Sequence, residues 1–491
     1  MKKAGGALLS SIEIDRSANR KVGVQLYMAL RDIILSGGLG AGDRLPASRT
    51  LAHEIGVSRT TVIDAVDRLV AEGLLVSRVG AGTFVSDILE HQRSAADGAT
   101  RARDAAQVPR LSHTIDHAFK AYAPRAWLPH TTGAFVTALP ALDAFPVSQW
   151  ARISARHLRG DREEIMGYGR PEGHEGLRRA IATHLNASRG IRCSPEQVFV
   201  TCGAQQAFSL IGRVLLNAGD RVWYENPGAV GARNAFVAAG AQLVPVSVDN
   251  EGLDVADGLR KAPHFRLGFV TPSHQQPLGH VMSLARRLEL LEAASDAQAL
   301  IVEDDYDGEF HFGPRSTPPL KSIDTQDRVI YVGTFSKTLF PSLRLGFMLV
   351  PESLTAAFER LFASWISTPP TSTQAVVADF MDEGHFAAHV RMMRRLYIER
   401  YEALMEASSA LPEGVSVQTT ASGFHTTAFL REDSNEENVV ESAAHRGVTV
   451  APIGRYCLEP IAQKGLVLGF GSTSPADSRA GMEALGQVVA T

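Results

Sequence analysis

Apolar residues in the first part of the chain recur at helical spacing, in short runs that glycines close. One such run covers residues 26–34, and its pattern predicts a first helix. A second helix is predicted to start with Ser48 as its cap and to end at Gly56, and a third to start with Ser58 as its cap. Since only Gly56 and Val57 lie between the second helix and the cap of the third, the spacing is typical of a helix-turn-helix.

Two strand-like runs, Leu74–Arg78 and Thr83–Val85, follow the third helix and predict a small β wing. The third helix opens with residues 58–61, Ser-Arg-Thr-Thr, whose hydroxyl and guanidinium groups suit the phosphates and base edges of DNA. Residues 20–85 carry eight Lys and Arg against six Asp and Glu, so the charge supports DNA binding only weakly. The alternative is a three-helix bundle that serves only for dimerisation.

A polar, alanine-rich stretch at 87–125 separates this region from the rest and is predicted to be a flexible or partly helical tether. From residue 126 onward, strand-like apolar runs alternate with helical stretches, which favours a mostly parallel α/β sheet. One long helical stretch is predicted after Pro369-Pro370. In open α/β sheets the carboxyl ends of the strands form the binding site. The strands of the sheet are predicted at 198–201, 221–224, 242–246, 267–270, 300–302 and 329–332, with later strands near 415–418 and 465–470.

The strand at 329–332 runs into Gly333-Thr-Phe-Ser-Lys337, where one lysine stands in an uncharged stretch. A lysine among apolar neighbours tends to lose its proton, and a neutral amine can form a Schiff base with an aldehyde. Thr334, Ser336 and Arg344 lie close enough in sequence to bind a phosphate. Together these groups suit pyridoxal phosphate (PLP), an aldehyde with a phosphate tail. The alternative is a surface lysine near a strand end.

Two further strand ends carry polar clusters. The turn at 202–205, Cys-Gly-Ala-Gln, precedes a helix predicted at 207–216, and it is either an anion site at a helix N-terminus or an ordinary turn. Residues 303–307, Glu-Asp-Asp-Tyr-Asp, would serve PLP if Asp304 paired with the pyridine nitrogen and Tyr306 donated to the phenolic oxygen. Carboxylates at strand ends also bind Mg²⁺, and acidic runs are often solvated turns, so both alternatives stay open.

Composition narrows the class of protein. The length of 491 residues fits two or three domains, and 45% of the residues are apolar and 21% charged. The formal net charge is −4, so any nucleic-acid site must be a local feature of the surface. The cysteines, Cys193, Cys202 and Cys457, lack metal-binding spacing and indicate reduced thiols. The first residues contain too short an apolar run for a secretion signal, and no stretch suits a membrane span. We therefore expect a cytoplasmic protein without a metal site.

The N-terminal motifs resemble a GntR-type winged helix. They are the run from Pro46 to Val62, the run Leu-Val-Ala-Glu-Gly-Leu-Leu at 69–75, and Gly-Ala-Gly-Thr-Phe-Val at 80–85. The resemblance implies that Gly80 and Gly82 lie in the wing near the minor groove. It also implies DNA contacts by Arg49, Ser58, Arg59, Thr60 and Thr61.

The later motifs resemble, in order, those of the fold-type I aminotransferases. With the winged helix in front, the chain resembles the MocR/GabR-type regulators from about residue 20 to its end. This implies a winged helix-turn-helix at 15–86, a linker at 87–125 and an aminotransferase-like α/β domain at 126–491, with a smaller subdomain from about residue 370. It also implies a head-to-tail, domain-swapped homodimer. The motifs are Tyr168-Gly-Arg-Pro-Glu-Gly, Gly203-Ala-Gln-Gln, Glu225-Asn-Pro-Gly, Thr271-Pro-Ser-His-Gln-Gln-Pro-Leu-Gly, Glu303-Asp-Asp-Tyr-Asp, Thr334-Phe-Ser-Lys and Ser422-Gly-Phe-His.

The same resemblance implies the residues of a PLP site. Lys337 would carry the cofactor as an internal aldimine, and His274 and Gln276 would lie on the loop beside the ring. Tyr168 would reach in from the partner subunit. The phosphate would be held by Gly203, Ala204, Gln205, Thr334, Ser336 and Arg344.

Three positions depart from the aminotransferase pattern. Ala229 stands where a ring-stacking aromatic is common, and Gln276 where an asparagine commonly contacts the cofactor. Val467 stands where an arginine usually binds the substrate carboxylate, so a strong, oriented contact is missing. The candidate replacements for that arginine are Arg170, Arg233 and His425, of which Arg233 better fits a structural role.

These departures favour a transcription regulator that senses an amine, an amino-acid-like effector or PLP itself through Lys337. Binding of the effector would change the spacing of the two DNA readers of a dimer. The runner-up is a working PLP-dependent aminotransferase with an appended DNA-binding domain, and a third hypothesis is a regulator that keeps the fold without the cofactor. The late arginines, Arg391, Arg394, Arg395 and Arg400, are predicted to lie on a solvated helix face rather than on DNA.

Overall fold

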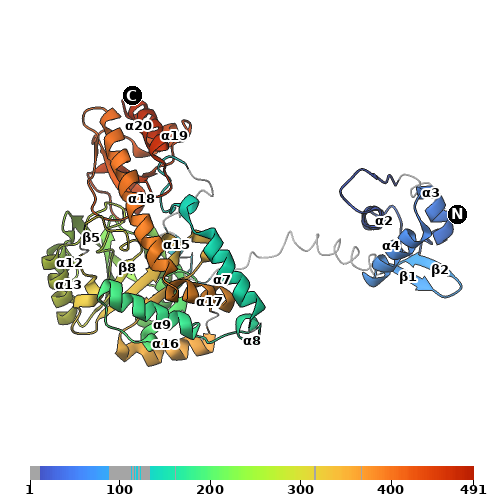
Figure 1. Cartoon of the computed structure of the whole chain (residues 1–491), viewed down its shortest axis with the longest axis horizontal. Coiled ribbons are helices and arrows are strands. Elements are labelled where there is room, and N and C mark those ends of the chain that lie inside the picture. The colour runs from blue at the N-terminus through green and yellow to red at the C-terminus, as the bar shows by residue number, and fades with distance from the viewer. Residues whose placement is uncertain are drawn as a thin grey trace. The chain divides into compact units, whose positions relative to one another are not determined.

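The computed structural model describes residues 12–87, 133–160, 162–313, 317–365 and 368–490, together with Ser112, Ile115, Asp116, Ala118, Phe119 and Tyr122. The chain divides into two compact units, residues 1–110 and 111–491 (Figure 1). The predicted linker at 87–125 lies almost entirely outside the described residues. Within the described ranges, no helix combines the length and hydropathy needed to cross a membrane.

The first unit is a bundle of helices with a two-stranded wing. One apolar stripe of each helix is buried in a common core with the wing, formed by Leu26, Leu30, Ile34, Leu51, Val62, Ala65, Leu69, Leu75 and Val85. The elements are α2 (Val22–Ser36), α3 (Ser48–Ile55), α4 (Arg59–Ala71), β1 (Leu75–Arg78) and β2 (Gly82–Val85). β1 and β2 pair antiparallel. The predicted helix-turn-helix and wing are confirmed.

One cap prediction was wrong. Ala47, not Ser48, is the N-cap of α3, and no side chain caps this helix. Ser48 is the first helical residue, and its Oγ accepts a hydrogen bond from Arg59 Nε of α4 at 3.3 Å. Ser58 does cap α4, since its Oγ accepts from the backbone N–H of Thr61 at 3.1 Å. Ser48 therefore links the two helices of the helix-turn-helix instead of starting one.

An eight-stranded sheet organises the second unit, in the order β3-β10-β9-β8-β7-β4-β5-β6. The strands from β5 through β4, β7 and β8 to β9 are parallel neighbours, whereas β10 is antiparallel to both β3 and β9. All six predicted strands are present, but β6 and β10 were not predicted. The bounds are β3 (Val198–Thr201), β4 (Arg221–Asn226), β5 (Gln242–Asp249), β6 (Gly252–Leu253), β7 (Leu267–Val270), β8 (Leu300–Asp305), β9 (Val329–Thr334) and β10 (Gly346–Leu349).

Helices cover both faces of this sheet, because successive strand residues point to opposite faces. Tyr224 of β4 belongs to a core with α10, α11 and α16, whereas the preceding Trp223 packs with α12 and α13. The helices up to this point in the chain are α7 (Val147–Arg159), α8 (Arg162–Met166), α9 (Glu175–His184), α10 (Ala204–Leu215), α11 (Val230–Ala238), α12 (Val255–Lys261), α13 (Leu284–Asp296), α14 (Leu320–Ile323), α15 (Phe335–Thr338) and α16 (Glu352–Trp365). Short helical turns lie at Leu142–Ala144, Leu185–Arg189, Pro195–Gln197 and Pro341–Leu343.

A smaller four-stranded sheet, in the order β11-β12-β14-β13, follows in the chain. Leu466 and Leu468 of β14 share a core with Tyr397 of α18 and Met482 of α20. The bounds are α17 (Thr371–Asp382), α18 (His385–Ala407), β11 (Ser416–Val417), β12 (His425–Leu430), α19 (Glu436–Ala444), β13 (Ala451–Pro452), β14 (Lys464–Gly469) and α20 (Pro475–Val489), with short turns at Ser408–Ala410 and Ile453–Tyr456.

The single long helix predicted after Pro370 is two helices. α17 and α18 are separated by Gly384, whose φ of +78° is a left-handed conformation that ends a helix. The solvated face predicted for the arginines of α18 is also wrong in part. Arg400 is buried and pairs with Asp143 at 2.9 Å, and Arg394 donates to the backbone carbonyl of Glu309.

Candidate cofactor site and DNA-binding surface

The candidate residues at the strand ends line one cavity of about 250 Å³. Residues that follow β3 and β9, and Asp304 within β8, form one side. Residues of the smaller subdomain, including His425 and Val467, form another. The predicted cofactor residues in this lining are Gly203, Ala204, Gln205, Gln276, Asp304, Tyr306, Thr334, Ser336, Lys337 and Arg344.

β10 brings the two candidate phosphate segments together. Gly346 lies opposite Thr201 of β3 and Thr334 of β9, the residues at which the two segments begin. A Cβ atom added at Gly346 would lie 2.9 Å from the Cα of Gly203 and 2.9 Å from the carbonyl oxygen of Gly333. Only a glycine at position 346 lets the two segments approach this closely.

The helix ends at this junction suit an anion. Gly203 is the N-cap of α10 with a φ of +87°, and the N–H groups of a first helical turn have no partner within the helix. Thr334 caps α15 by accepting from the N–H of Ser336 at 3.2 Å. Arg344 adds a cation on the cavity wall. Backbone donors, hydroxyls and a guanidinium therefore converge, which favours the anion site over an ordinary turn.

Lys337 points into the cavity from α15. Its Nζ donates to the carbonyl oxygen of Ala138 at 2.6 Å, and the side chain is half-buried. The alternative of a solvated surface lysine is therefore wrong.

Asp304 provides the test of whether the residues present fit PLP. Its side chain is 6% exposed, and its Oδ1 is buried without a hydrogen-bond partner among the described residues. Burial, together with the neighbouring Asp305, raises the pKa of Asp304 well above its usual range. A protonated pyridine nitrogen would give this carboxyl group both a donor and a positive charge, so the residues fit the cofactor.

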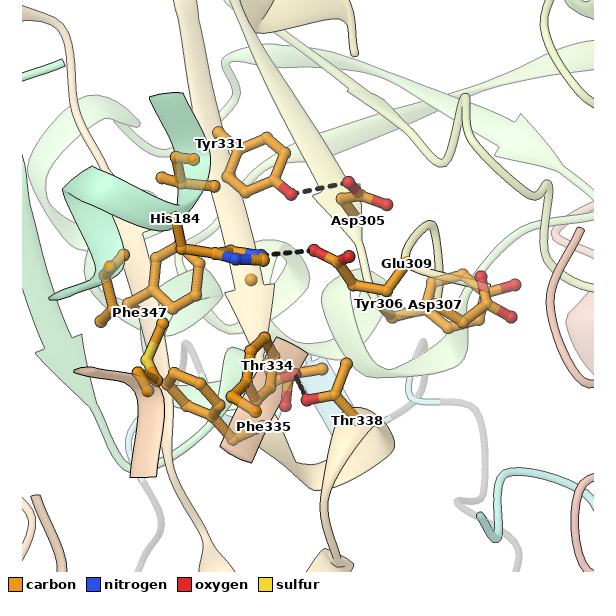
Figure 2. A pocket seen from close by; sticks show the side chains of 15 residues that line it. His184, Asp305, Tyr306, Asp307, Glu309, Tyr331, Thr334, Phe335, Thr338 and Phe347 are labelled. Carbon is orange, nitrogen blue, oxygen red and sulfur yellow. Dashed lines mark hydrogen bonds and ion pairs between the residues drawn. The ribbon is translucent and has the colours of Figure 1, made fainter. Parts of the chain in front are cut away.

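The other acidic side chains of the 303–307 run point elsewhere, and the run is buried rather than solvated. Glu303 accepts from the N–H groups of Leu320 and Lys321, each at 2.8 Å. Asp305 pairs with Arg189 and accepts from the Tyr331 hydroxyl at 2.6 Å, beside the His184–Glu309 pair (Figure 2). Among the described residues, Glu303 and Asp305 therefore have protein partners of their own, which favours the PLP interpretation over the Mg²⁺ alternative.

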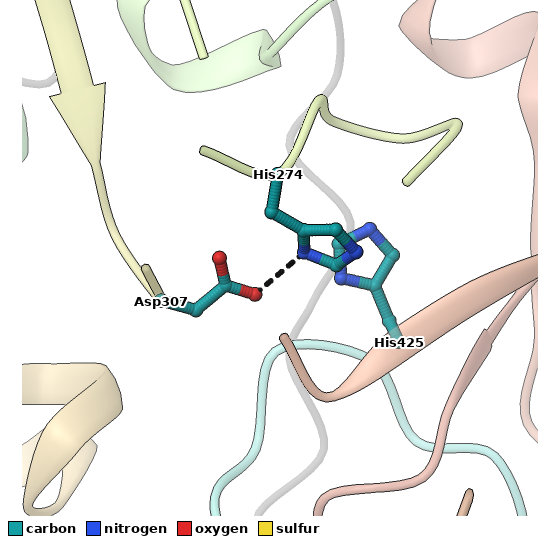
Figure 3. A group of neighbouring side chains, drawn as sticks. All are labelled: His274, Asp307 and His425. Carbon is teal, nitrogen blue, oxygen red and sulfur yellow. Dashed lines mark hydrogen bonds and ion pairs between the residues drawn. The ribbon is translucent and has the colours of Figure 1, made fainter. Parts of the chain in front are cut away.

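His274 lies behind the cavity rather than in its lining. Its Nδ1 is 2.8 Å from Oδ2 of Asp307, and its ring centroid is 4.3 Å from that of His425, which does line the cavity (Figure 3). The Tyr306 hydroxyl donates to the carbonyl oxygen of His274 at 2.8 Å. The three side chains His274, Asp307 and His425 are all buried. His274 can thus act on a ligand only through its neighbours.

Gly423 leaves room for the cluster of His274, Asp307 and His425 because it has no Cβ. Gly423→Ala is therefore expected to lower the free energy of unfolding of the second unit by about 2–4 kcal/mol. Its φ is +80°, and an added Cβ would overlap the His274 ring and lie 2.5 Å from Oδ2 of Asp307. Gly384→Ala is the control, because its φ is +78° but its Cβ would meet no described atom within 4 Å. Thermal unfolding should therefore show a larger loss for Gly423→Ala, and equal losses would contradict the steric argument.

Tyr168, which was predicted to contact the cofactor from the partner subunit, and the candidate replacements for the missing arginine differ in position. Tyr168 is fully exposed and lies outside the cavity of its own chain. Arg170 is exposed beside Glu175, and Arg233 donates to the carbonyl oxygen of Cys457 at 3.0 Å, so neither lines the cavity. Of the candidate replacements for the missing arginine, His425 lies in the lining.

The lining residues that sequence reasoning missed include two with polar side chains from the smaller subdomain, Arg455 and Tyr456. They lie on the turn Ile453–Tyr456, far in sequence from every strand end of the large sheet, and no local pattern marks them. Arg455 pairs with Glu437 at 2.9 Å at the exposed rim. Ala229 and Val467, the departures from the aminotransferase pattern, are both in the lining.

The candidate DNA residues of the first unit gather on α3, the start of α4 and the wing. Arg49, Arg59 and Thr60 are exposed, Thr61 is half-buried, and Ser58 is engaged as the cap of α4. Gly80, in the turn between β1 and β2, and Gly82, the first residue of β2, both have positive φ. A Cβ at Gly82 would lie 2.8 Å from Nε of Arg44, a cation beside the wing that the sequence did not single out.

Comparison with known proteins gives the same two parts. The family of bacterial regulatory proteins, gntR family, matches residues 23–85, and the family aminotransferase class I and II matches residues 140–461. A probable rhizopine catabolism regulatory protein MocR from Rhizobium meliloti is 40% identical over 96% of this chain and 94% of its own length. The HTH-type transcriptional regulator TauR from Rhodobacter capsulatus is 33% identical over 92% and 93% of the two chains.

A solved structure supports the fold of the second unit. Kynurenine aminotransferase from Pyrococcus horikoshii, crystallised with PMP, superposes with a TM-score of 0.69 at 27% identity, covering 78% of this chain and 95% of that chain. The predicted fold class, a winged helix-turn-helix followed by a fold-type I α/β domain, is confirmed, and the cofactor that the family and fold indicate is pyridoxal phosphate. The relatives favour the regulator over the working aminotransferase. The chain belongs to the MocR-type transcription regulators, in which a gntR-family winged helix is joined to an aminotransferase class I and II domain.

Proposed function

We propose that this regulator binds operator DNA through α3, α4 and the wing, and that an amine or PLP itself, bound at Lys337, changes its affinity for that DNA. The observation that carries the proposal is the cavity lined by Lys337, by Asp304, whose Oδ1 has no hydrogen-bond partner among the described residues, and by helix N-termini suited to an anion. The Rhizobium meliloti relative is named for the regulation of rhizopine catabolism, which supports control of genes for the use of a small molecule.

The residues proposed to hold PLP have separate tasks. When bound, the cofactor supplies an aldehyde that condenses with amines and a ring that withdraws electrons. Lys337 would hold it covalently, and Asp304 would hold the proton on the ring nitrogen. The first turn of α10, Thr334, Ser336 and Arg344 would hold the phosphate.

Two features of the wall support sensing rather than turnover. Ala229 supplies no aromatic surface for a ring, and Val467 supplies no charge for a carboxylate. A working transaminase would transfer the amino group of an effector to a keto acid in steady turnover, so an assay for the new amino acid tests this alternative directly.

We propose a head-to-tail, domain-swapped homodimer. Exposed apolar side chains on and after α7 and α8 support it: Val147, Leu158 and Met166 are 65%, 55% and 67% exposed, and Tyr168 is fully exposed. A second copy covering this face would bury them and bring its Tyr168 toward the cavity. Sedimentation of the full chain at micromolar concentration tests the proposal, and a monomer would overturn it.

The decisive experiment titrates the holo-protein with amines and with free PLP while two signals are followed: the absorbance of the bound cofactor and the affinity for a duplex selected from a random pool. A ligand that shifts both signals at the same concentration is the effector. If no ligand changes DNA affinity, the regulatory proposal fails.

Arg59→Ala is expected to weaken binding of the selected duplex by about 10- to 100-fold while the cofactor stays bound. Arg59 is exposed at the start of α4, where a guanidinium can reach the DNA. The matched control is Arg391→Ala, which removes one exposed guanidinium from α18 of the second unit. Fluorescence anisotropy at several salt concentrations measures both variants, and equal binding by Arg59→Ala and the wild type would contradict the assignment.

A further inference from the structure

The wing of the first unit has one buried face and one outer face. Leu75 of β1 and Val85 of β2 belong to the core of the unit, and they lie opposite each other in the strand register. Since successive side chains of a strand point to opposite faces, Arg78, Gly82 and Phe84 share the outer face. That face of the wing strands is the one that a large partner can reach.

A third extended segment adds Arg44 to the outer face. Arg44 forms an antiparallel bridge with Phe84, and the N–H of the next residue, Leu45, donates to the carbonyl oxygen of Thr83 at 2.9 Å. Residues directly opposite in antiparallel pairing present their side chains on the same face. The guanidinium of Arg44 extends over Gly82, because a Cβ added there would lie 2.8 Å from Nε and 3.2 Å from a terminal nitrogen of Arg44.

Arg78 reaches the same face from the other strand of the wing. It lies opposite Gly82 in the register, and its guanidinium carbon is 5.1 Å from the centroid of the Phe84 ring, as in a cation–π contact. The two arginines therefore cross: Arg44 lies opposite Phe84 and extends over Gly82, whereas Arg78 lies opposite Gly82 and extends over Phe84. Both guanidinium groups are held above one short strand, next to the turn at the tip of the wing.

The two positive charges lack a protein counter-charge. Both arginines are exposed, and within residues 12–87 neither guanidinium is paired with a carboxylate, whereas Arg31 of α2 is paired with Glu72 at 3.4 Å. Like charges held close together repel each other, and an anion bound beside both of them removes that cost. A guanidinium presents a planar fork of donors that matches the oxygens of a phosphate.

We propose that Arg44 and Arg78 form a clamp for the phosphate backbone of DNA on the outer face of the wing. The assignment rests on the proposed function, in which the start of α4 reads the bases. Gly82 is part of the clamp because its missing Cβ leaves room for the guanidinium of Arg44. Phosphate contacts fix the position of a protein on DNA but carry no sequence information, so the clamp strengthens binding to every duplex by the same factor.

The salt dependence of DNA binding tests the clamp in the full chain. Arg44→Gln and Arg78→Gln are each expected to weaken binding of the selected duplex about tenfold at about 0.1 M salt. Each should also reduce the slope of log K against log salt concentration by about 0.9, the value for one lost phosphate contact. The matched control is Arg31→Gln, which removes an exposed arginine that already has a carboxylate partner and should leave the slope unchanged. Wild-type slopes in both wing variants would overturn the proposal.

Gly82 offers a second test that removes no charge. Gly82→Ala should displace the guanidinium of Arg44 and weaken binding about as much as Arg44→Gln does, and the two changes together should weaken it no further. Gly42→Ala is the control, because its φ of +76° is equally unfavourable for alanine but its Cβ would meet no described atom within 4 Å. Equal losses in the two alanine variants, or additive losses in the double variant, would contradict the clamp.

A shuffled duplex of the same composition separates the clamp from the function on which it rests. Arg44→Gln and Arg78→Gln should weaken binding of the selected and the shuffled duplex equally, whereas Arg59→Ala should affect the selected duplex more. If the wild type binds neither duplex, the proposed function fails. If Arg59→Ala weakens binding but the wing variants lower only the midpoint of thermal unfolding and not the salt slope, the two arginines are structural and only the clamp is wrong.

Discussion

Lys337→Ala is expected to abolish covalent retention of PLP and, with it, every response of DNA binding to amines. The Nζ of Lys337 lies in the cavity shared with Asp304 and the anion-holding helix ends, and the side chain is the only lysine in the described lining. The phosphate contacts would remain, so the variant should still bind PLP reversibly, but at least about 100-fold more weakly, since a covalent bond is lost. The winged helix lies in the other unit, so the variant should still bind its duplex, but with an affinity that no longer responds to amines.

Reduction with borohydride followed by peptide mass measurement is the test. The wild type should show a pyridoxyl group fixed at position 337, and the alanine variant should show none. Lys337→Arg is the matched control, because it restores the positive charge but cannot form a Schiff base. A pyridoxyl group found on another lysine, or wild-type retention by either variant, would overturn the assignment of Lys337.

Gly346→Ala is expected to reduce PLP affinity by about 10- to 100-fold and to destabilise the second unit by about 2 kcal/mol or more. Its Cβ would lie 2.9 Å from backbone atoms of both Gly203 and Gly333, and backbone cannot turn aside as a side chain can. The two anion-holding segments would therefore move apart by several tenths of an ångström. The phosphate contacts depend on the distance between the two segments, so Gly346→Ala should lower the affinity for PLP while the second unit still folds.

A matched control comes from Gly268, a glycine within β7. Its added Cβ would lie 3.7 Å from the ring of Phe265, an ordinary contact, so Gly268→Ala should leave both PLP affinity and stability near the wild type. Equilibrium dialysis of PLP and thermal unfolding of the apo-protein measure the two effects separately. Wild-type PLP affinity in Gly346→Ala would show that the close approach of the segments does not matter for the cofactor.

Local patterns were enough to predict the elements but not all of their partners. The six apolar runs became strands of the large sheet, and glycine punctuation located α3 and α4. β10 escaped prediction because its four residues follow a motif that already had an interpretation, and one of its two partners, β3, lies in a distant part of the chain. The break between α17 and α18 could have been predicted as well, because Gly384 is a residue type that commonly ends a helix.

The candidate site could be predicted where residues with suitable chemical groups lie at the carboxyl ends of strands. Lys337, Asp304 and Tyr306 follow that rule, and all three line the cavity. Arg455 does not, because a turn of the smaller subdomain carries it to the rim. The placement of His274 behind His425 likewise depends on tertiary packing, to which Gly423 contributes by having no Cβ. Ser48 shows why the N-cap of a helix is difficult to predict from sequence, since several residues near the start of a helix can occupy that position.

The edge position of β3 has a consequence for synthesis of the chain. β3 ends at Thr201, its neighbour in the sheet is β10, and β10 ends at Leu349, so about 150 residues must be translated before the two can pair. At the usual rates of bacterial translation this interval is roughly 7–30 s. During that time the nascent polypeptide carries an unpaired strand edge and has no assembled phosphate pocket. Ribosome-bound chains that end before Gly346 should therefore depend on chaperones and should not bind PLP.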